Sequence, residues 1–448
     1  MELTNGEFAD FEGGKIPASR IRELMVRADD LDPRGLRVRN ARIEGQLDLC
    51  DVSAKRPLAL QDCTTDAPVL LDRARLSALD LTGLVAPAVS GPWLRLEHYL
   101  YLGRARLDGG SDDYALDLAE ATVGGHVSLR GAHFRSETEY AVHAPRLRTG
   151  SEVYLTDVVA VGTVRLEGAY IGGNLYCGGS FFGGSDIALL AVDMQVDGSV
   201  FLSRGFRASA ETYTAVRMRG SRIGGQLVLR DGVASGPVAL DVKQSRVGME
   251  VFFPMGFADG EVDLDGLTYT GLPRDAGLDD WLDLLAHKTP RYATQPYAQL
   301  AAAHQAAGHE RDVRRIRIAQ QRDLQRRGQL TRWGRLWHRV TGATVGYGYR
   351  PATALLWLLG TLALSIALIT GLAGPVGAVR CSIVEQVGYA LNAVAPLAKL
   401  DGQQRCQVAT TTGVGQVVVV TTWILQLLAW AFATLFVAGF TGLVRKNP

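Results

Sequence analysis

The chain has 448 residues, enough for two or three domains. Its 47 basic and 46 acidic side chains nearly cancel, which argues against nucleic-acid binding driven by net charge. The five cysteines form no Cys-x-x-Cys pair, and no histidine stands out at a metal-ligand spacing, so we expect no metal site and no cofactor.

The N-terminal segment, residues 1–35, is expected to cap the domain that follows. Residues 1–17 hold acidic side chains and no apolar core, which is not the pattern of a signal peptide. Residues 19–28 predict a short amphipathic helix with Ile21, Leu24 and Met25 on one face. A β-solenoid needs such a cap because its first coil would otherwise expose core and strand edge.

Residues 36–272 repeat one short unit: a β-branched residue, one or two glycines, and an apolar-x-apolar strand. Strand starts recur about every 25 residues, with a second strand half a period later, and fixed periods of this size indicate a stacked array. Short strands between glycine-rich turns predict a parallel β-helix, that is, a β-solenoid. The clearest copies place strands at Leu47, Val127, Leu175 and Leu227.

The shape of one coil has two interpretations. In the last coil an apolar residue recurs at every fifth position, which resembles degenerate pentapeptide repeats. Elsewhere the spacing drifts towards a plain right-handed parallel β-helix, and the sequence leaves both open. The residues with the period of five are Val242, Val247, Phe252, Phe257, Val262 and Leu267.

The outward residue of each glycine-led strand should stack into a ladder, and most of this ladder is aromatic. A contiguous exposed stripe of this kind marks a contact surface. Either a loop or helix of the same chain covers it, or it is a subunit interface. The aromatic stripe consists of Tyr101, Tyr154, Tyr176, Phe201 and Phe252.

The half-period strands give a second ladder that we expect to be wet and charged, with Asp117, Arg165, Arg217 and Asp263. A carbohydrate-cleaving β-helix enzyme would need acidic residues, but Asp48 and Asp80 are explained as outward ladder positions. We therefore expect no catalytic residues and no enzyme activity.

Residues 273–350 predict a helical connector. Helices are expected over 278–287, 296–307 and 310–327, the last two joined by Gly308 into one tetratricopeptide-like hairpin that packs on the solenoid or on a neighbour. Trp333, Leu336 and Trp337, with arginines between them, indicate a helix at a membrane surface. Residues 344–348 spell a potassium-channel filter, but they precede the first apolar run, where a filter cannot lie.

Residues 351–448 predict a two-span membrane domain. The runs 352–374 and 417–440 carry no charge, and about 20 apolar residues suffice to cross a bilayer. Arginines crowd the approach to the first run, and Arg445 and Lys446 follow the second. The positive-inside rule then puts both termini and the solenoid in the cytoplasm, below the plasma (inner) membrane.

The segment between the runs predicts a short helix over 382–392, with Ser382 as N-cap, and a non-helical turn over 393–396. Span, short helix, turn and span resemble a bacterial family that joins a pentapeptide-like β-solenoid to a potassium-channel-like two-span pore module. Some of its members are labelled membrane-associated oxidoreductase, but the sequence has no glycine-rich phosphate loop, flavin pattern or haem pattern.

The resemblance implies an ion-channel-like protein, and the membrane segments supply candidate residues. An amide inside a span faces a partner or water, so Gln426 is either pore lining or an interhelical hydrogen-bonding group. Two carboxylates could bias cations at the outer mouth, and two cysteines of the same loop could form a disulfide or both be free. Candidates are Thr422, Gln426, Thr434, Asn392, Ala393 and Val394 for the pore, Glu385 and Asp401 for the mouth, and Cys381 and Cys406 for the disulfide.

Two functions follow as expectations. The first is a homo-oligomeric channel, most simply a homotetramer in a lipid bilayer, whose cytoplasmic solenoid senses or docks an unknown ligand or protein. The second is a non-conducting membrane-anchored scaffold whose solenoid binds protein or envelope partners. Neither function involves nucleic acid.

Overall fold

The structure, a computed structural model, describes residues 3–109, 114–328, 331, 351–372, 382–394 and 413–440. The chain divides into two compact units, Met1–Ile316 and Arg317–Pro448, and the boundary lies inside helix α4 (Glu310–Arg327). The first unit holds a β-solenoid and the helices that follow it. The second holds the apolar helices.

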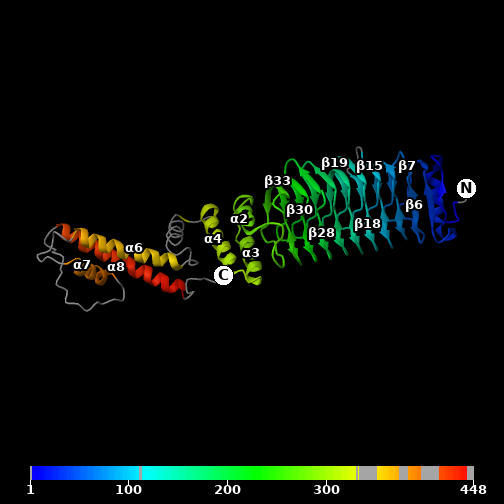
Figure 1. Ribbon diagram of the computed structural model, residues 1–448. Helices are drawn as coiled ribbons and strands as arrows, with labels where there is room; N and C mark the ends of the chain where they lie inside the picture. Colours follow the sequence, from blue (N-terminus) through cyan, green and yellow to red (C-terminus); the bar gives the residue numbers. More distant parts are fainter. Residues whose placement is uncertain are drawn as a thin grey trace. The chain divides into compact units, whose positions relative to one another are not determined.

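Residues 9–263 form a parallel β-solenoid of about ten coils, which confirms the predicted fold class at this level (Figure 1). Each strand pairs in parallel with the corresponding strands of the coils before and after it, and the paired strands make three sheets. Sheet A contains β1 (Ala9–Asp10), β3 (Leu36–Arg39), β6 (Leu58–Gln61), β10 (Leu79–Asp80), β14 (Leu100–Tyr101), β18 (Val127–Ser128), β21 (Val153–Tyr154), β24 (Leu175–Tyr176), β28 (Val200–Phe201), β32 (Leu227–Val228) and β35 (Val251–Phe252).

The other two sheets complete each coil, which passes sheet A, then two segments of sheet B, then sheet C. Sheet B contains β2 (Lys15–Pro17), β4 (Arg42–Glu44), β7 (Thr64–Thr65), β8 (Val69–Leu70), β11 (Val85–Ala86), β12 (Val89–Ser90), β15 (Arg106–Asp108), β16 (Tyr114–Asp117), β19 (His133–His143), β22 (Val159–Arg165), β25 (Phe181–Gly184), β26 (Ile187–Leu190), β29 (Arg207–Ala210), β30 (Thr214–Arg217), β33 (Val233–Asp241) and β36 (Ala258–Asp263). Sheet C contains β5 (Ser53–Ala54), β9 (Arg75–Leu76), β13 (Arg95–Leu96), β17 (Thr122–Val123), β20 (Arg148–Thr149), β23 (Tyr170–Ile171), β27 (Gln195–Val196), β31 (Arg222–Ile223) and β34 (Arg246–Val247).

The interior follows from the alternation of side chains along very short strands. In β24, Leu175 points inward and is fully buried, whereas its neighbour Tyr176 points outward. Larger rings fill the middle of the stack, where Phe182 meets Phe206 edge to face at a centroid distance of 5.4 Å. The apolar-x-apolar pattern therefore builds one continuous core along the axis.

The glycines of the repeated unit mark the corner between sheet C and sheet A, where successive backbones lie almost in contact. A Cβ atom on Gly124 would stand 2.1 Å from the carbonyl oxygen of Glu97, and one on Gly150 would stand 2.0 Å from that of Gly124. No side chain fits such a gap without moving the backbone. The recurring glycine is thus a requirement of coil stacking at these positions.

The first coil begins earlier than the sequence predicts. Strands β1 and β2 precede the helix and pair with β3 and β4, so the segment expected only as a cap already belongs to the sheets. Helix α1 (Ala18–Val26), followed by a 3-10 turn (Ala28–Asp30), buries Ile21, Leu24 and Met25 as predicted.

One strand of the predicted ladder lies on another side of the coil. Asp48 pairs with Leu70 of sheet B, whereas the sheet A position before Asp80 is Ala59. The sequence pattern around Gly45 resembles the later copies, but it spans the corner within sheet B. Every side of the coil buries its residues in the same alternation, so the pattern alone does not identify the side.

Two helices close the C-terminal end of the solenoid, as expected for the connector. Helices α2 (Leu278–His287) and α3 (Thr294–Ala306) follow β36, and Trp281 packs on Phe253 with a ring-centroid distance of 5.5 Å. Gln295 accepts a hydrogen bond from the backbone N–H of Gly266 and donates one to the carbonyl of Leu267. The last coil thereby finds partners for backbone groups that an open edge would expose.

Candidate functional site

The aromatic stripe occupies the outward positions of sheet A. The rings of Tyr154 and Tyr176 stack at 5.2 Å and 5°, and those of Tyr176 and Phe201 stack at 5.0 Å and 5°. Tyr101 approaches His126 at 5.2 Å, because the intervening ladder position is Ser128. The predicted ladder of rings is therefore present, with the residues in the predicted order.

Arginines in the turns that follow two strands of sheet A lie over part of the aromatic stripe. The guanidinium of Arg130 lies 4.1 Å from the ring centroid of Tyr154, and that of Arg230 lies 4.3 Å from the ring centroid of Phe252. All five aromatic side chains of the stripe remain half-buried in the single chain. The stripe therefore places partly exposed aromatic rings beside guanidinium groups on one surface of the solenoid.

The side chains of the half-period ladder are less exposed to solvent than expected. Asp117 is 6% exposed and accepts a hydrogen bond from His143 at 2.9 Å, if that imidazole nitrogen carries its proton. Asp241 is 1% exposed and pairs with Arg219 and with Arg217 of the preceding coil. The expectation of a solvated face is wrong at these positions, because side chains of neighbouring coils lie over the carboxylates.

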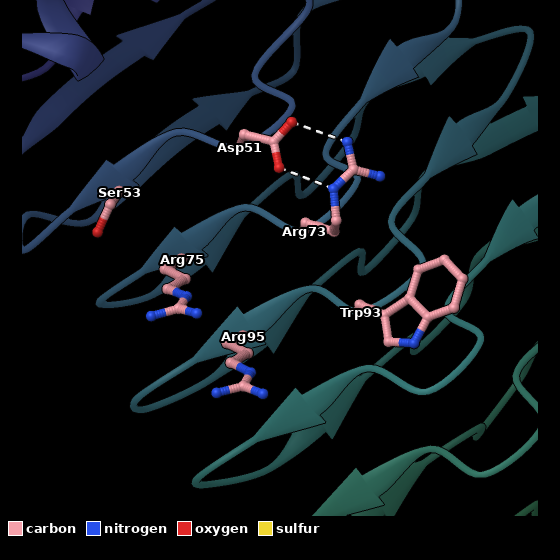
Figure 2. A pocket seen from close by; sticks show the side chains of 6 residues that line it. All are labelled: Asp51, Ser53, Arg73, Arg75, Trp93 and Arg95. Atoms are coloured by element: carbon pink, nitrogen blue, oxygen red, sulfur yellow. Dashed lines mark hydrogen bonds and ion pairs between the residues drawn. The ribbon is translucent and has the colours of Figure 1, made fainter.

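An open hollow of about 700 Å³ lies where sheet B turns into sheet C. The hollow is lined by Asp51, Ser53, Arg73, Arg75, Trp93 and Arg95. Figure 2 shows Arg75 and Arg95 on adjacent strands, pointing to the same side, with Asp51 and Arg73 facing each other nearby. We call this set the arginine hollow.

Three of the six residues that line the arginine hollow are positioned by a left-handed backbone conformation at the corner between sheets B and C. Asp51, Arg73 and Trp93 occupy the same turn in successive coils, and each has a φ of 58–59°. This left-handed backbone costs about 1 kcal/mol or more in an L-residue, so the stacked coils on either side must hold it. This conformation directs the side chains of Asp51, Arg73 and Trp93 outward in register.

The electrostatics of the arginine hollow leave excess positive charge. Arg73 donates two hydrogen bonds of 2.7 Å to Asp51, and these lower the pKa of the Asp51 carboxyl below its ordinary value. Arg75 and Arg95 are exposed and have no ion pair among the described residues. Two guanidinium groups beside an exposed indole could bind a carboxylate, sulfate or phosphate group that carries a flat apolar portion.

The arginine hollow was not among the predicted sites. Its signal in the sequence is the Arg-Leu pair that occurs at Arg75 and again at Arg95, one short coil later. The pattern continues along sheet C, where Arg148, Arg222 and Arg246 hold the same outward position.

The second unit contains two helices long and apolar enough to cross a membrane. Within α6 (Pro351–Leu372) the candidate span is Thr353–Gly371, and within α8 (Gly413–Phe440) it is Gln416–Ala438. Only 22% and 28% of these stretches are buried inside the chain. Both predicted spans are thus found as apolar helices, the second beginning four residues before the predicted start.

A short helix packs against both long ones. Helix α7 (Ile383–Val394) contacts α6 and α8, and Val394 is buried with Leu425 and Ala429 of α8. Ser382 and Glu385 exchange hydrogen bonds at its start, a capping box that confirms Ser382 as N-cap. The helix continues through Ala393 and Val394, so the expectation of a non-helical turn is wrong for these two residues.

The candidate pore residues occupy different surroundings. Thr422 is half-buried and donates its hydroxyl to the carbonyl of Val418, while exposed Thr434 donates to those of Trp430 and Ala431. Gln426 is exposed on the same helix, with no hydrogen-bond partner for its amide among the described residues. Asn392 is half-buried on α7, and the outer-mouth candidate Glu385 accepts a hydrogen bond from the backbone N–H of Ser382 in the capping box.

Several predictions fall outside the described residues. These are the outer-mouth residue Asp401, the cysteines 381 and 406, the helix at 333–337 and the filter-like sequence at 344–348. Of the three cysteines among the described residues, Cys63 and Cys177 are fully buried and free, and burial raises the pKa of Cys63 to about 11. Such thiols are packing groups with little nucleophilic character.

No protein-family model matches the chain, and no curated protein or solved structure matches it either.

Proposed function

We propose that the chain is one subunit of a homo-oligomeric, ion-channel-like membrane protein, most simply a homotetramer, whose β-solenoid docks a ligand or protein partner. The observation that carries this proposal is helix α7 packed against both candidate spans. A span, a short helix and a second span form the layout of a pore module. Two spans cannot enclose a pore alone, so several copies must gather.

Gln426 supports the oligomer. Its amide is exposed in the single chain, on a helix otherwise rich in apolar side chains. Hydrocarbon does not satisfy an amide, so the group needs either a second subunit or water in a pore.

We place the solenoid and both termini on the cytoplasmic side of the plasma membrane. Arginines before the first span and Arg445 and Lys446 after the second support this orientation, since the loop between the spans has only three basic residues, Arg380, Lys399 and Arg405. We also infer a right-handed, pentapeptide-like coil. Val69 pairs with Val89 twenty residues later, and this spacing equals four pentapeptides, which supports a pentapeptide-like coil at this point of the stack.

Planar-bilayer recording of the purified full-length protein tests the proposal. We expect single-channel currents from the wild type and an altered or lost current for Gln426→Leu. If the amide joins subunits, its removal should also weaken association by about 0.6–2 kcal/mol per contact, measured by native mass spectrometry in detergent. Leu427→Ile, a change at an exposed apolar neighbour, is the matched control. A silent wild-type protein, or a monomer, would contradict the channel.

A membrane-anchored scaffold is the second candidate, because the aromatic stripe and the arginine hollow are surfaces suited to docking. Changing Tyr154, Tyr176 and Phe201 together to serine separates the uses of the stripe. Loss of two stacked pairs should cost about 1–3 kcal/mol in stability, and a subunit interface would in addition reduce the oligomer size by light scattering. Phe181→Ser, at an exposed ring of sheet B, is the control. Unchanged size together with unchanged stability would exclude the stripe as an interface.

A further inference from the structure

Three potential metal ligands meet at the turn between α3 and α4. His304 lies in the last turn of α3, His309 follows the turn, and Asp312 lies in the first turn of α4. Their ligand atoms all lie within 4.8 Å of one another. All three residues belong to the first unit of the chain.

The backbone of the turn brings these side chains together. Gly308 adopts a φ of +78°, which ends α3 in a left-handed residue, and the N–H of His309 donates to the carbonyl of His304 at 2.9 Å. The chain then reverses at once into α4, where the N–H of Asp312 bonds to the carbonyl of His309. The two imidazole rings thereby approach to 5.6 Å between centroids.

His304 is a buried polar group without a partner. It is 9% exposed, and its Nδ1 atom has no hydrogen bond within the described part of the chain. The nearest acceptor, Oδ2 of Asp312, is 3.6 Å away, too far for a hydrogen bond. Buried nitrogen atoms are seldom left unsatisfied, so this one calls for a bound species.

The donor atoms suit a cation. An imidazole nitrogen without a hydrogen bond and a nearby carboxylate oxygen can both donate an electron pair to a metal ion. A divalent ion between the rings and the carboxylate would satisfy the nitrogen and neutralise the acid.

An arginine contacts the other oxygen of the Asp312 carboxylate. Arg315 approaches Oδ1 of Asp312 at 3.6 Å, which leaves Oδ2 on the side of His304. Arg315 also pairs with Asp279 of α2, so its charge is shared between two acids. Supporting groups of this kind orient metal ligands in known sites.

We propose that His304, His309 and Asp312 bind one divalent transition-metal ion, with zinc the best match. Two imidazoles and one carboxylate are ligands that zinc accepts, whereas calcium and magnesium take oxygen ligands. Ligand atoms around tetrahedral zinc lie about 3.3 Å apart, so the exposed side chain of His309 must swing inward on binding. The fourth position is left for water or another ligand.

Metal binding at this site would affect the helical connector formed by α3 and α4. A bound ion joins the end of α3 to the start of α4 and rigidifies this helical hairpin. This inference goes beyond the proposed channel and is independent of it, because the site can bind metal whether or not the protein conducts.

The test uses full-length protein in detergent, purified without a polyhistidine tag and stripped with a chelator. Zinc is titrated against a competing chromophoric chelator, and cobalt serves as a spectroscopic probe of tetrahedral geometry. We expect one zinc per chain and, with cobalt, the intense visible bands of a tetrahedral site.

Variants assign the binding to these residues. His309→Ala, at an exposed position that should not disturb folding, is expected to weaken zinc binding by about 100-fold or more, and Asp312→Asn by about 10-fold or more. His287→Ala is the matched control, since His287 is also exposed and faces an aspartate, Asp283, at 2.8 Å. Failure of the wild type to bind zinc saturably would overturn the proposal. So would unchanged affinity in His309→Ala, or an equal loss in His287→Ala.

Discussion

Replacing Asp241 with alanine is expected to destabilise the C-terminal part of the solenoid by about 3–5 kcal/mol, because the change leaves a partly buried cation without its counter-ion. Asp241 is 1% exposed and lies 3.5 Å from Arg217, whose side chain is 16% exposed. It also accepts hydrogen bonds from Arg219 and from the backbone N–H of Lys243. The Asp241 carboxylate thus interacts with two arginines and with one backbone N–H of the following turn.

The measurement must be local, because stacked coils unfold in part as well as in whole. Hydrogen exchange of the peptides over 214–263 should report faster opening in Asp241→Ala. The control is Asp66→Ala, which removes an ion pair with Arg42 at a side chain 81% exposed. That pair should contribute less than about 1 kcal/mol. Equal exchange in the two variants would show that the carboxylate is not structurally important.

Replacing Phe182 with alanine is expected to cost about 3–5 kcal/mol through the cavity it leaves in the core. Phe182 is fully buried and lies edge to face on Phe206 of the next coil. Its neighbour Phe181 is 38% exposed, since successive residues of a strand point to opposite faces.

Phe181→Ala is therefore a control one residue away with the same change in size. Chemical unfolding followed by far-ultraviolet circular dichroism should show a large loss for Phe182→Ala and a loss within about 0.5 kcal/mol for Phe181→Ala. Reversed losses would mean that the register of β25 is wrong by one residue.

The sequence predicts the solenoid well because its signal is repeated many times. The strands at Val127, Leu175 and Leu227 are all found in sheet A, with the outward rings in order. Helices α2 and α4 have the predicted bounds, because helical periodicity replaces strand alternation abruptly after the last coil.

What the sequence does not reveal is which side of the coil a strand occupies. Leu47 carries the same local pattern as Val127, yet it belongs to sheet B, since burial alternates identically on every side. The strands at Ala9 and Lys15 were missed because they are only two and three residues long, and each has a single buried residue.

The candidate sites were predicted less completely than the fold. The aromatic stripe follows from one ladder, whereas the arginine hollow combines a ladder with a corner whose left-handed backbone has no single residue signature. The proposed ligands His304 and Asp312 meet only because the chain reverses direction between α3 and α4. Their spacing in the sequence is therefore not that of a known metal-binding motif. Contacts made by chain reversal are the ones that one-dimensional patterns miss.

Coil length varies mainly within sheet B. The passage from sheet B to sheet C uses the same number of residues from Ser90 to Leu96 as from Arg165 to Ile171. Within sheet B, by contrast, Ala86 to Ser90 is short and Leu107 to Asp117 is long. The connection between the two segments of sheet B therefore accommodates different loop lengths. Evolution, or an engineer inserting a reporter peptide, can lengthen the chain there while the rest of the stack keeps its register.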